Sequence, residues 1–168
     1  FLSGIIGSQF SPVKSLATLP MALSIVGVAI FAIFAAKVMS IIGRRAGFMF
    51  ASVGSSLSSL LAAYSIISES FILFNFACFL LGAGVAFSHQ YRFAAVETVK
   101  KDMAPKAISI ILLAGIGSAF IGPNAANLSK EIISGHLYAG SYIVLAALTL
   151  TSTIFLMFYK DRHKPNNI

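Results

Sequence analysis

The chain has 168 residues, of which 58% are hydrophobic and 10% charged, and its mean hydropathy is +0.91. Soluble domains carry roughly 25% charged residues, and a chain this short cannot bury so much apolar surface in one globular core. This composition excludes a soluble domain, and the formal net charge of +7 must be interpreted in a protein that is embedded in lipid.

Hydrophobic segments along the chain predict how it crosses the membrane. Residues 1–7 are apolar but too short to span, because a spanning helix needs about 20 apolar residues. We interpret them as the end of an earlier helix, with the native N-terminus upstream of Phe1. Five later segments are long enough, which predicts an all-α integral membrane bundle of five complete transmembrane helices plus the remnant of a first. The predicted spans are 16–39, 46–67, 70–96, 108–126 and 137–159.

The basic residues are distributed unequally between the two sides of this bundle. If successive loops alternate sides, ten Lys and Arg residues fall on one side and two on the other. The positive-inside rule then places the loop with Arg44 and Arg45 in the cytoplasm, together with the tail 160–168. The charge thus reflects topology and implies no nucleic-acid partner. We predict one transmembrane bundle over residues 1–159, surrounded by the lipid bilayer, and the start of a cytoplasmic linker at 160–168.

The loop after the first complete span carries a motif. Residues 36–45 resemble the loop signature of the major facilitator superfamily, G-x-x-x-D-R-x-G-R-R, and lie where that family places it. Gly43, Arg44 and Arg45 match its last three positions. Ser40 replaces the acidic residue, so the pairing of that residue across the bundle is not carried over to this chain. Without the resemblance, Gly-Arg-Arg is an ordinary positively charged membrane-boundary segment.

The span 46–67 is rich in small residues, including Gly54 and Ser58 at small-xxx-small spacing. Helices in lipid approach one another closely through such residues. We therefore expect tight helix packing here, with a polar path lined by the serines as the alternative.

Polar residues within the span 70–96 are candidates for transport. Asn75 lies in its outer part, where an interhelical hydrogen bond is the alternative role. His89 and Arg92 are three residues apart and share a helical face near its inner end. They are candidates for moving substrate or protons, whereas snorkelling and structural pairing are the alternative. Glu97 and Lys101, four residues apart, are predicted to pair on a solvated surface.

Residues 109–127 resemble the antiporter signature of the same superfamily, G-x8-G-x3-G-P-x2-G-G. Gly122 and Pro123 are identical to it, and Ser118 keeps a small residue at a glycine position. A proline breaks one backbone hydrogen bond, and small neighbours allow another helix to approach the bend. The resemblance implies an exporter, whereas a plain proline kink is the alternative.

Two further segments extend the resemblance over almost the whole chain. Residues 17–20 (ATLP) open the first complete span and 91–95 (YRFAA) lie at the inner end of the third. Together they are similar to a bacterial subgroup of the superfamily. The family's usual motif in that third span places an Arg before the glycines, whereas Arg92 follows Gly82 and Gly84, so a proton-transfer role is not carried over to Arg92.

These resemblances imply the N-terminal half of a secondary transporter in the bacterial inner membrane. We expect export of a small molecule by alternating access, coupled to proton or ion antiport, with the C-terminal half of the same transporter as partner. The alternative is a non-transporting membrane scaffold or assembly subunit.

An enzyme is not expected. The sequence has no paired intramembrane aspartates, no H-E-x-x-H motif and no evident nucleophile beside a base. The three histidines are too far apart in sequence to suggest a local metal site, and no cofactor is expected.

Overall fold

The structure is a computed structural model that describes residues 2–158, apart from the side chain of Thr98. The predicted linker at 160–168 lies outside the described residues. The described part of the chain is helical and contains no strands. Its helices are α1 (Leu2–Phe10), α2 (Leu19–Ile42), α3 (Arg44–Ile67), α4 (Phe71–Ser88), α5 (Tyr91–Thr98), α6 (Ala104–Ser129) and α7 (Ala139–Met157), with 3-10 turns at Lys14–Leu16 and Lys101–Met103.

Residues at the helix starts explain where several helices begin. Pro20 lies in the first turn of α2 and Pro105 in the first turn of α6, where the missing N–H would have no acceptor within the helix. The hydroxyl of Ser70 accepts a hydrogen bond from the backbone N–H of Leu73 at 3.4 Å and caps α4. The helix starts therefore follow from local chemistry.

Five segments of the described chain are long and apolar enough to cross a membrane. This confirms the predicted all-α bundle of five membrane helices, which the nine-residue α1 precedes. Within the third segment, a turn at His89 and Gln90 separates α4 from α5. The candidate spans are Lys14–Ile42, Arg44–Ile67, Phe71–Glu97, Lys101–Ser129 and Ala139–Met157.

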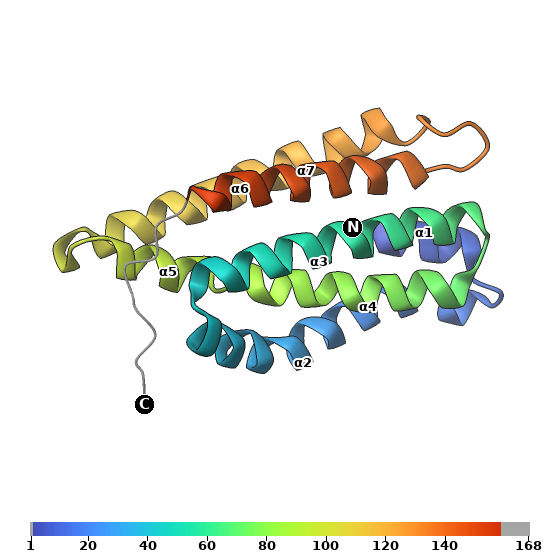
Figure 1. Ribbon diagram of the computed structural model, residues 1–168. Helices are drawn as coiled ribbons and strands as arrows, with labels where there is room; N and C mark the ends of the chain where they lie inside the picture. The colour runs from blue at the N-terminus through green and yellow to red at the C-terminus, as the bar shows by residue number, and fades with distance from the viewer. Residues whose placement is uncertain (1, 159–168) are drawn as a thin grey trace.

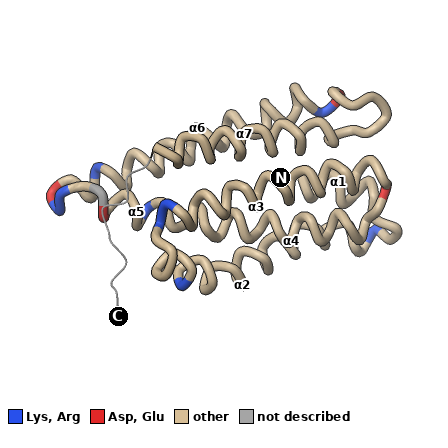
Figure 2. The backbone as a smooth tube through the Cα atoms, in the orientation of Figure 1, with Lys and Arg blue, Asp and Glu red and all other residues tan. Residues whose placement is uncertain are grey.

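The surface of the bundle is that of a lipid-exposed protein. Large apolar side chains point outward, among them Ile72 (83% exposed), Ile33 (76%) and Phe155 (73%). Lys, Arg, Asp and Glu gather at the two ends of the bundle and leave its middle uncharged (Figure 2). We call these ends the Arg44 end and the Glu69 end. Such a surface is stable in the hydrocarbon core of a membrane, because lipid chains cannot form hydrogen bonds with polar groups there.

The helices form layers around α3. Figure 1 shows α3 and α4 side by side, with α2 against α4 and the pair α6 and α7 on the other side of α3. The core has two clusters of buried apolar residues. One contains Ile6, Ala62, Ala63, Ile66, Phe74, Ala77, Cys78, Ala139 and Tyr142, and the other contains Ala35, Met39, Phe48, Phe87 and Ala94.

Two glycines bring α2 and α4 into close contact. A Cβ atom on Gly27 would lie 2.3 Å from the carbonyl oxygen of Phe79, and one on Gly82 would lie 2.2 Å from that of Ser24. No side chain fits in this space, so the two backbones meet directly.

Hydroxyl groups join α3 to α7. The Ser56 hydroxyl donates to the Ala146 carbonyl at 3.1 Å, and the Thr153 hydroxyl donates to Ser52 Oγ at 2.8 Å. Ser58 instead donates to Gly54 of its own helix at 2.8 Å. A Cβ added to Gly54 would meet nothing within 4 Å. The serines of α3 therefore serve packing, but Gly54 and Ser58 do not form the close helix contact that we expected.

Candidate functional site

Gly43 alone connects α2 to α3 at the Arg44 end. Its φ is 85° and its ψ is 159°, a backbone region that is essentially restricted to glycine. Its N–H donates to the Met39 carbonyl at 3.1 Å, and its own carbonyl accepts from the Gly47 N–H at 3.1 Å. One residue thus closes one helix and opens the next, which sets the direction of the two arginines that follow.

Arg44 forms a bidentate ion pair with Glu97 of α5. Its Nε donates to Oε2 of the carboxylate and its Nη2 donates to Oε1. The Arg44 side chain is 19% exposed and that of Glu97 43%. α5 ends at Thr98, so Lys101 is not one turn further along the same helix, and the helical spacing on which we expected it to pair with Glu97 is absent. The ion pair joins two helices that are far apart in sequence.

Arg45 contacts a third helix. Its Nη2 donates to the backbone carbonyl of Met157, the last residue of α7. The final carbonyls of a helix lack partners within the helix and carry partial negative charge, so a guanidinium stabilises them. We call Gly43, Arg44 and Arg45 the loop clamp, since together they link α2, α3, α5 and α7. Ser40 is exposed and donates to the Lys37 carbonyl of its own helix at 2.8 Å.

The Arg44–Glu97 pair is testable by a double-mutant cycle. We expect a coupling energy of about 1 kcal/mol between Arg44→Ala and Glu97→Ala, because the bonds are bidentate and charge-assisted but the carboxylate is partly solvated. Thermal unfolding of the purified protein in detergent micelles would measure it. The exposed Lys130–Glu131 pair, with N···O 3.8 Å, serves as the control and should show almost no coupling. A coupling at the Arg44–Glu97 pair as small as that of the control would contradict this prediction.

The predicted transport residues lie apart from one another. Asn75 is buried in α4, and its Nδ2 donates to the Phe71 carbonyl at 2.8 Å. Its Oδ1 has no hydrogen-bond partner among the described residues. His89 lies in the turn after α4 and Arg92 in α5, both exposed. Since Asn75 and His89 are separated by roughly 20 Å of helix, these residues do not form one site within this chain.

The predicted kink residues lie on α6. Ser118 and Gly122 are exposed and Pro123 is half-buried, and the helix continues through Pro123. The Ser118 hydroxyl donates to the Gly115 carbonyl of its own helix at 2.7 Å. A Cβ added to Gly122 would meet nothing within 4 Å. Within the described chain, Gly122 therefore does not bring another helix into close contact, whereas α6 meets α7 closely near its end, where a Cβ on Gly140 would lie 2.4 Å from the Ser129 carbonyl oxygen.

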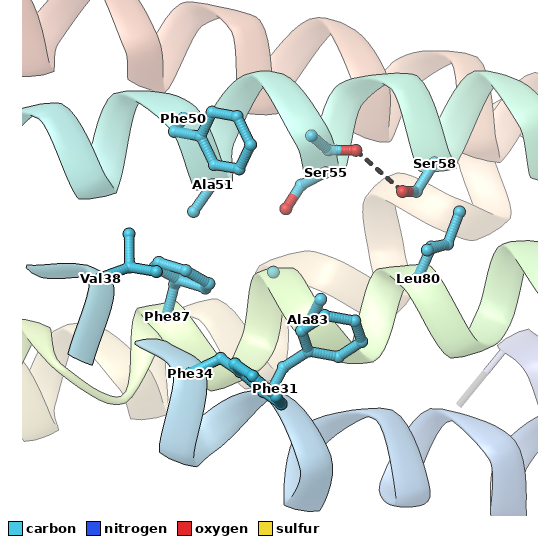
Figure 3. A pocket seen from close by; sticks show the side chains of 12 residues that line it. Phe31, Phe34, Val38, Phe50, Ala51, Ser55, Ser58, Leu80, Ala83 and Phe87 are labelled. Atoms are coloured by element: carbon cyan, nitrogen blue, oxygen red, sulfur yellow. Dashed lines mark hydrogen bonds between the residues drawn. The ribbon is translucent and has the colours of Figure 1, made fainter. Parts of the chain in front are cut away.

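An apolar groove of about 310 Å³ lies between α2, α3 and α4 (Figure 3). The groove is not apparent in the sequence, since its aromatic residues are indistinguishable from ordinary lipid-facing ones until the helices are placed. It contains none of the predicted transport residues and no charged side chain. Its lining residues are Phe31, Phe34, Val38, Phe50, Ala51, Gly54, Ser55, Ser58, Leu80, Ala83, Gly84 and Phe87.

Metal chemistry finds no support in residues 2–158, where no three His, Cys, Asp or Glu side chains are close enough to hold an ion. The arrangement instead offers a helix-linking ion pair at one end of the bundle and an apolar groove within it.

Comparison with known proteins identifies the family. The Major Facilitator Superfamily profile matches residues 1–168. The chain belongs to the major facilitator superfamily. It is therefore a multi-pass membrane protein of a transporter family, which points to a non-enzymatic role. No solved structure showed a significant match.

Two relatives within the superfamily show how much of a transporter the chain represents. It is 31% identical to the riboflavin transporter RfnT of Brucella anthropi, and the match covers 99% of this chain and 43% of that protein. It is 28% identical to the uncharacterized MFS-type transporter YdeG of Bacillus subtilis, covering 95% of this chain and 38% of that protein. The chain thus spans less than half the length of these relatives.

Proposed function

We propose that this chain is the N-terminal half of a secondary transporter that moves a small molecule by alternating access. The superfamily match over residues 1–168, on a bundle with five membrane-spanning helices, is the observation that carries the proposal. The greater length of the relatives supports a C-terminal half as partner. In transporters built from two such halves, substrate binds near the midplane between them and one half rocks against the other.

The proposed orientation places the loop clamp and the tail 160–168 in the cytoplasm and the protein in the bacterial inner membrane. The excess of basic residues at the Arg44 end supports this orientation, and the bacterial relatives support the inner membrane. The ATLP and YRFAA segments support the assignment of this chain to a bacterial subgroup of the superfamily.

The direction of transport that we propose is export, coupled to proton or ion antiport. The similarity of residues 109–127 to the antiporter signature supports it, with Ser118, Gly122 and Pro123 as the motif. We propose Asn75, His89 and Arg92 as polar residues that act in transport. The buried Asn75 Oδ1 lacks a partner among the described residues, and a buried polar atom left unpaired is a feature that a functional role would explain.

The name of one relative makes riboflavin the first substrate to test. We expect the full-length protein in liposomes to move labelled riboflavin against its gradient when a proton gradient is imposed, and to stop when an ionophore collapses that gradient. Empty liposomes are the control. Flux in the opposite direction would refute export, and proton-independent flux would refute proton coupling. No flux of riboflavin or other small aromatic solutes under proton or sodium gradients would favour the scaffold alternative.

A further inference from the structure

The depth of the groove between α2, α3 and α4 follows from the positions of its lining residues along α3. On α3 its lining runs from Phe50 to Ser58, about 12 Å along the helix axis. Phe50 is roughly 9 Å from the start of α3 at Arg44. A hydrocarbon core is about 30 Å thick, so the groove extends from the leaflet at the Arg44 end across the middle of the membrane.

The mouth of the groove is open to the surface of the bundle. Phe34 of α2 and Phe50 of α3 lie on opposite sides of it (Figure 3). They are 56% and 70% exposed. Both rings are therefore accessible from outside the described bundle.

The chemistry of the lining favours a hydrocarbon chain over a polar solute. Its hydroxyls belong to Ser55 and Ser58, and that of Ser58 already donates to the Gly54 carbonyl. A molecule with several polar groups would lose hydration there without enough hydrogen bonds in return.

A basic side chain lies at the level where such a hydrocarbon chain would carry its head group. Lys37 directly precedes the lining residue Val38 on α2, is exposed, and takes part in no ion pair within residues 2–158. A lysine here extends its ammonium group towards the membrane surface. The positive charge of this ammonium group complements a phospholipid head group whose net charge is negative.

We propose that the groove binds one acyl chain of an anionic phospholipid, whose head group is held by Lys37. The proposal concerns the lipid that surrounds this half of the protein and does not depend on the transported substrate. The two parts of the lipid make separate contacts, so each can be removed alone.

Native mass spectrometry of the full-length protein, titrated with phosphatidylglycerol or phosphatidylcholine, tests the proposal. Lys37→Gln should weaken phosphatidylglycerol binding about fivefold, since one surface lysine is lost, and leave phosphatidylcholine binding unchanged. Gly54→Leu should abolish one binding event, because a side chain at this open position extends into the groove. Gly115→Leu on α6, where a Cβ also meets nothing within 4 Å, is the matched control and should bind as the unmodified protein does.

The outcomes separate the alternatives. Equal binding of the two lipids, or no effect of Lys37→Gln, overturns the role of Lys37 and of the anionic head group. Unchanged lipid binding in Gly54→Leu overturns the groove as the site, and if riboflavin binding falls instead, the groove holds substrate. Lys37 is exposed, so we expect Lys37→Gln to fold normally. The Lys37→Gln measurement therefore tests the proposal even if Gly54→Leu misfolds.

Discussion

Gly82→Leu is expected to prevent α2 from packing on α4 and to leave little folded protein. A Cβ at this position would lie 2.2 Å from the Ser24 carbonyl oxygen and 2.9 Å from the Val28 nitrogen. Both are backbone atoms of α2, so the clash cannot be relieved by a change of rotamer. The helices would have to separate, which we expect to cost about 3 kcal/mol or more of unfolding free energy.

Size-exclusion profiles and thermal unfolding in detergent micelles would measure this effect. Gly115→Leu is the matched control, because a Cβ there meets nothing within 4 Å, and it should give a stable, monodisperse protein. Gly27→Ala should act in the same direction as Gly82→Leu, since its Cβ would lie 2.3 Å from the Phe79 carbonyl oxygen. If Gly82→Leu were as stable as Gly115→Leu, the backbones of α2 and α4 would not be in direct contact at Gly82.

Gly43→Ala is expected to lower the unfolding free energy by about 2 kcal/mol, because residues with a side chain are strained by 1–3 kcal/mol in this backbone region. The φ of 85° and ψ of 159° leave no room for a Cβ without a change in the direction of α3. That change would also move Arg44 and Arg45 away from their partners on α5 and α7. Transport should therefore fall together with stability.

Thermal unfolding and the transport assay on the same preparation would test this expectation. Gly115→Ala on α6 is the control with the opposite sign, because alanine is favoured over glycine within a regular helix by up to about 1 kcal/mol. If Gly43→Ala were as stable as the unmodified protein, the connection between α2 and α3 would not require glycine.

Part of the candidate site could be recognised from sequence, but its contacts could not. The motif and the charges marked Gly43, Arg44 and Arg45 as a loop of interest. Their partners were not predictable, because Arg44 and Glu97 are separated by 53 positions and no local periodicity relates them. The spacing that suggested Lys101 as a partner of Glu97 assumed one continuous helix, and α5 ends at Thr98.

The sequence by itself determined the class of this protein, the number of its membrane helices and the family to which it belongs. The class and the number of spans follow from local composition, since each apolar segment must satisfy its own backbone in lipid whatever its neighbours are. The family follows from the motifs and from the match of the superfamily profile. Only the tertiary structure decided that Gly27 meets Phe79, that Arg44 meets Glu97, and that three helices enclose an apolar groove. Helices in lipid are not paired by hydrophobic pattern, so which faces meet depends on shape complementarity between segments far apart in the chain.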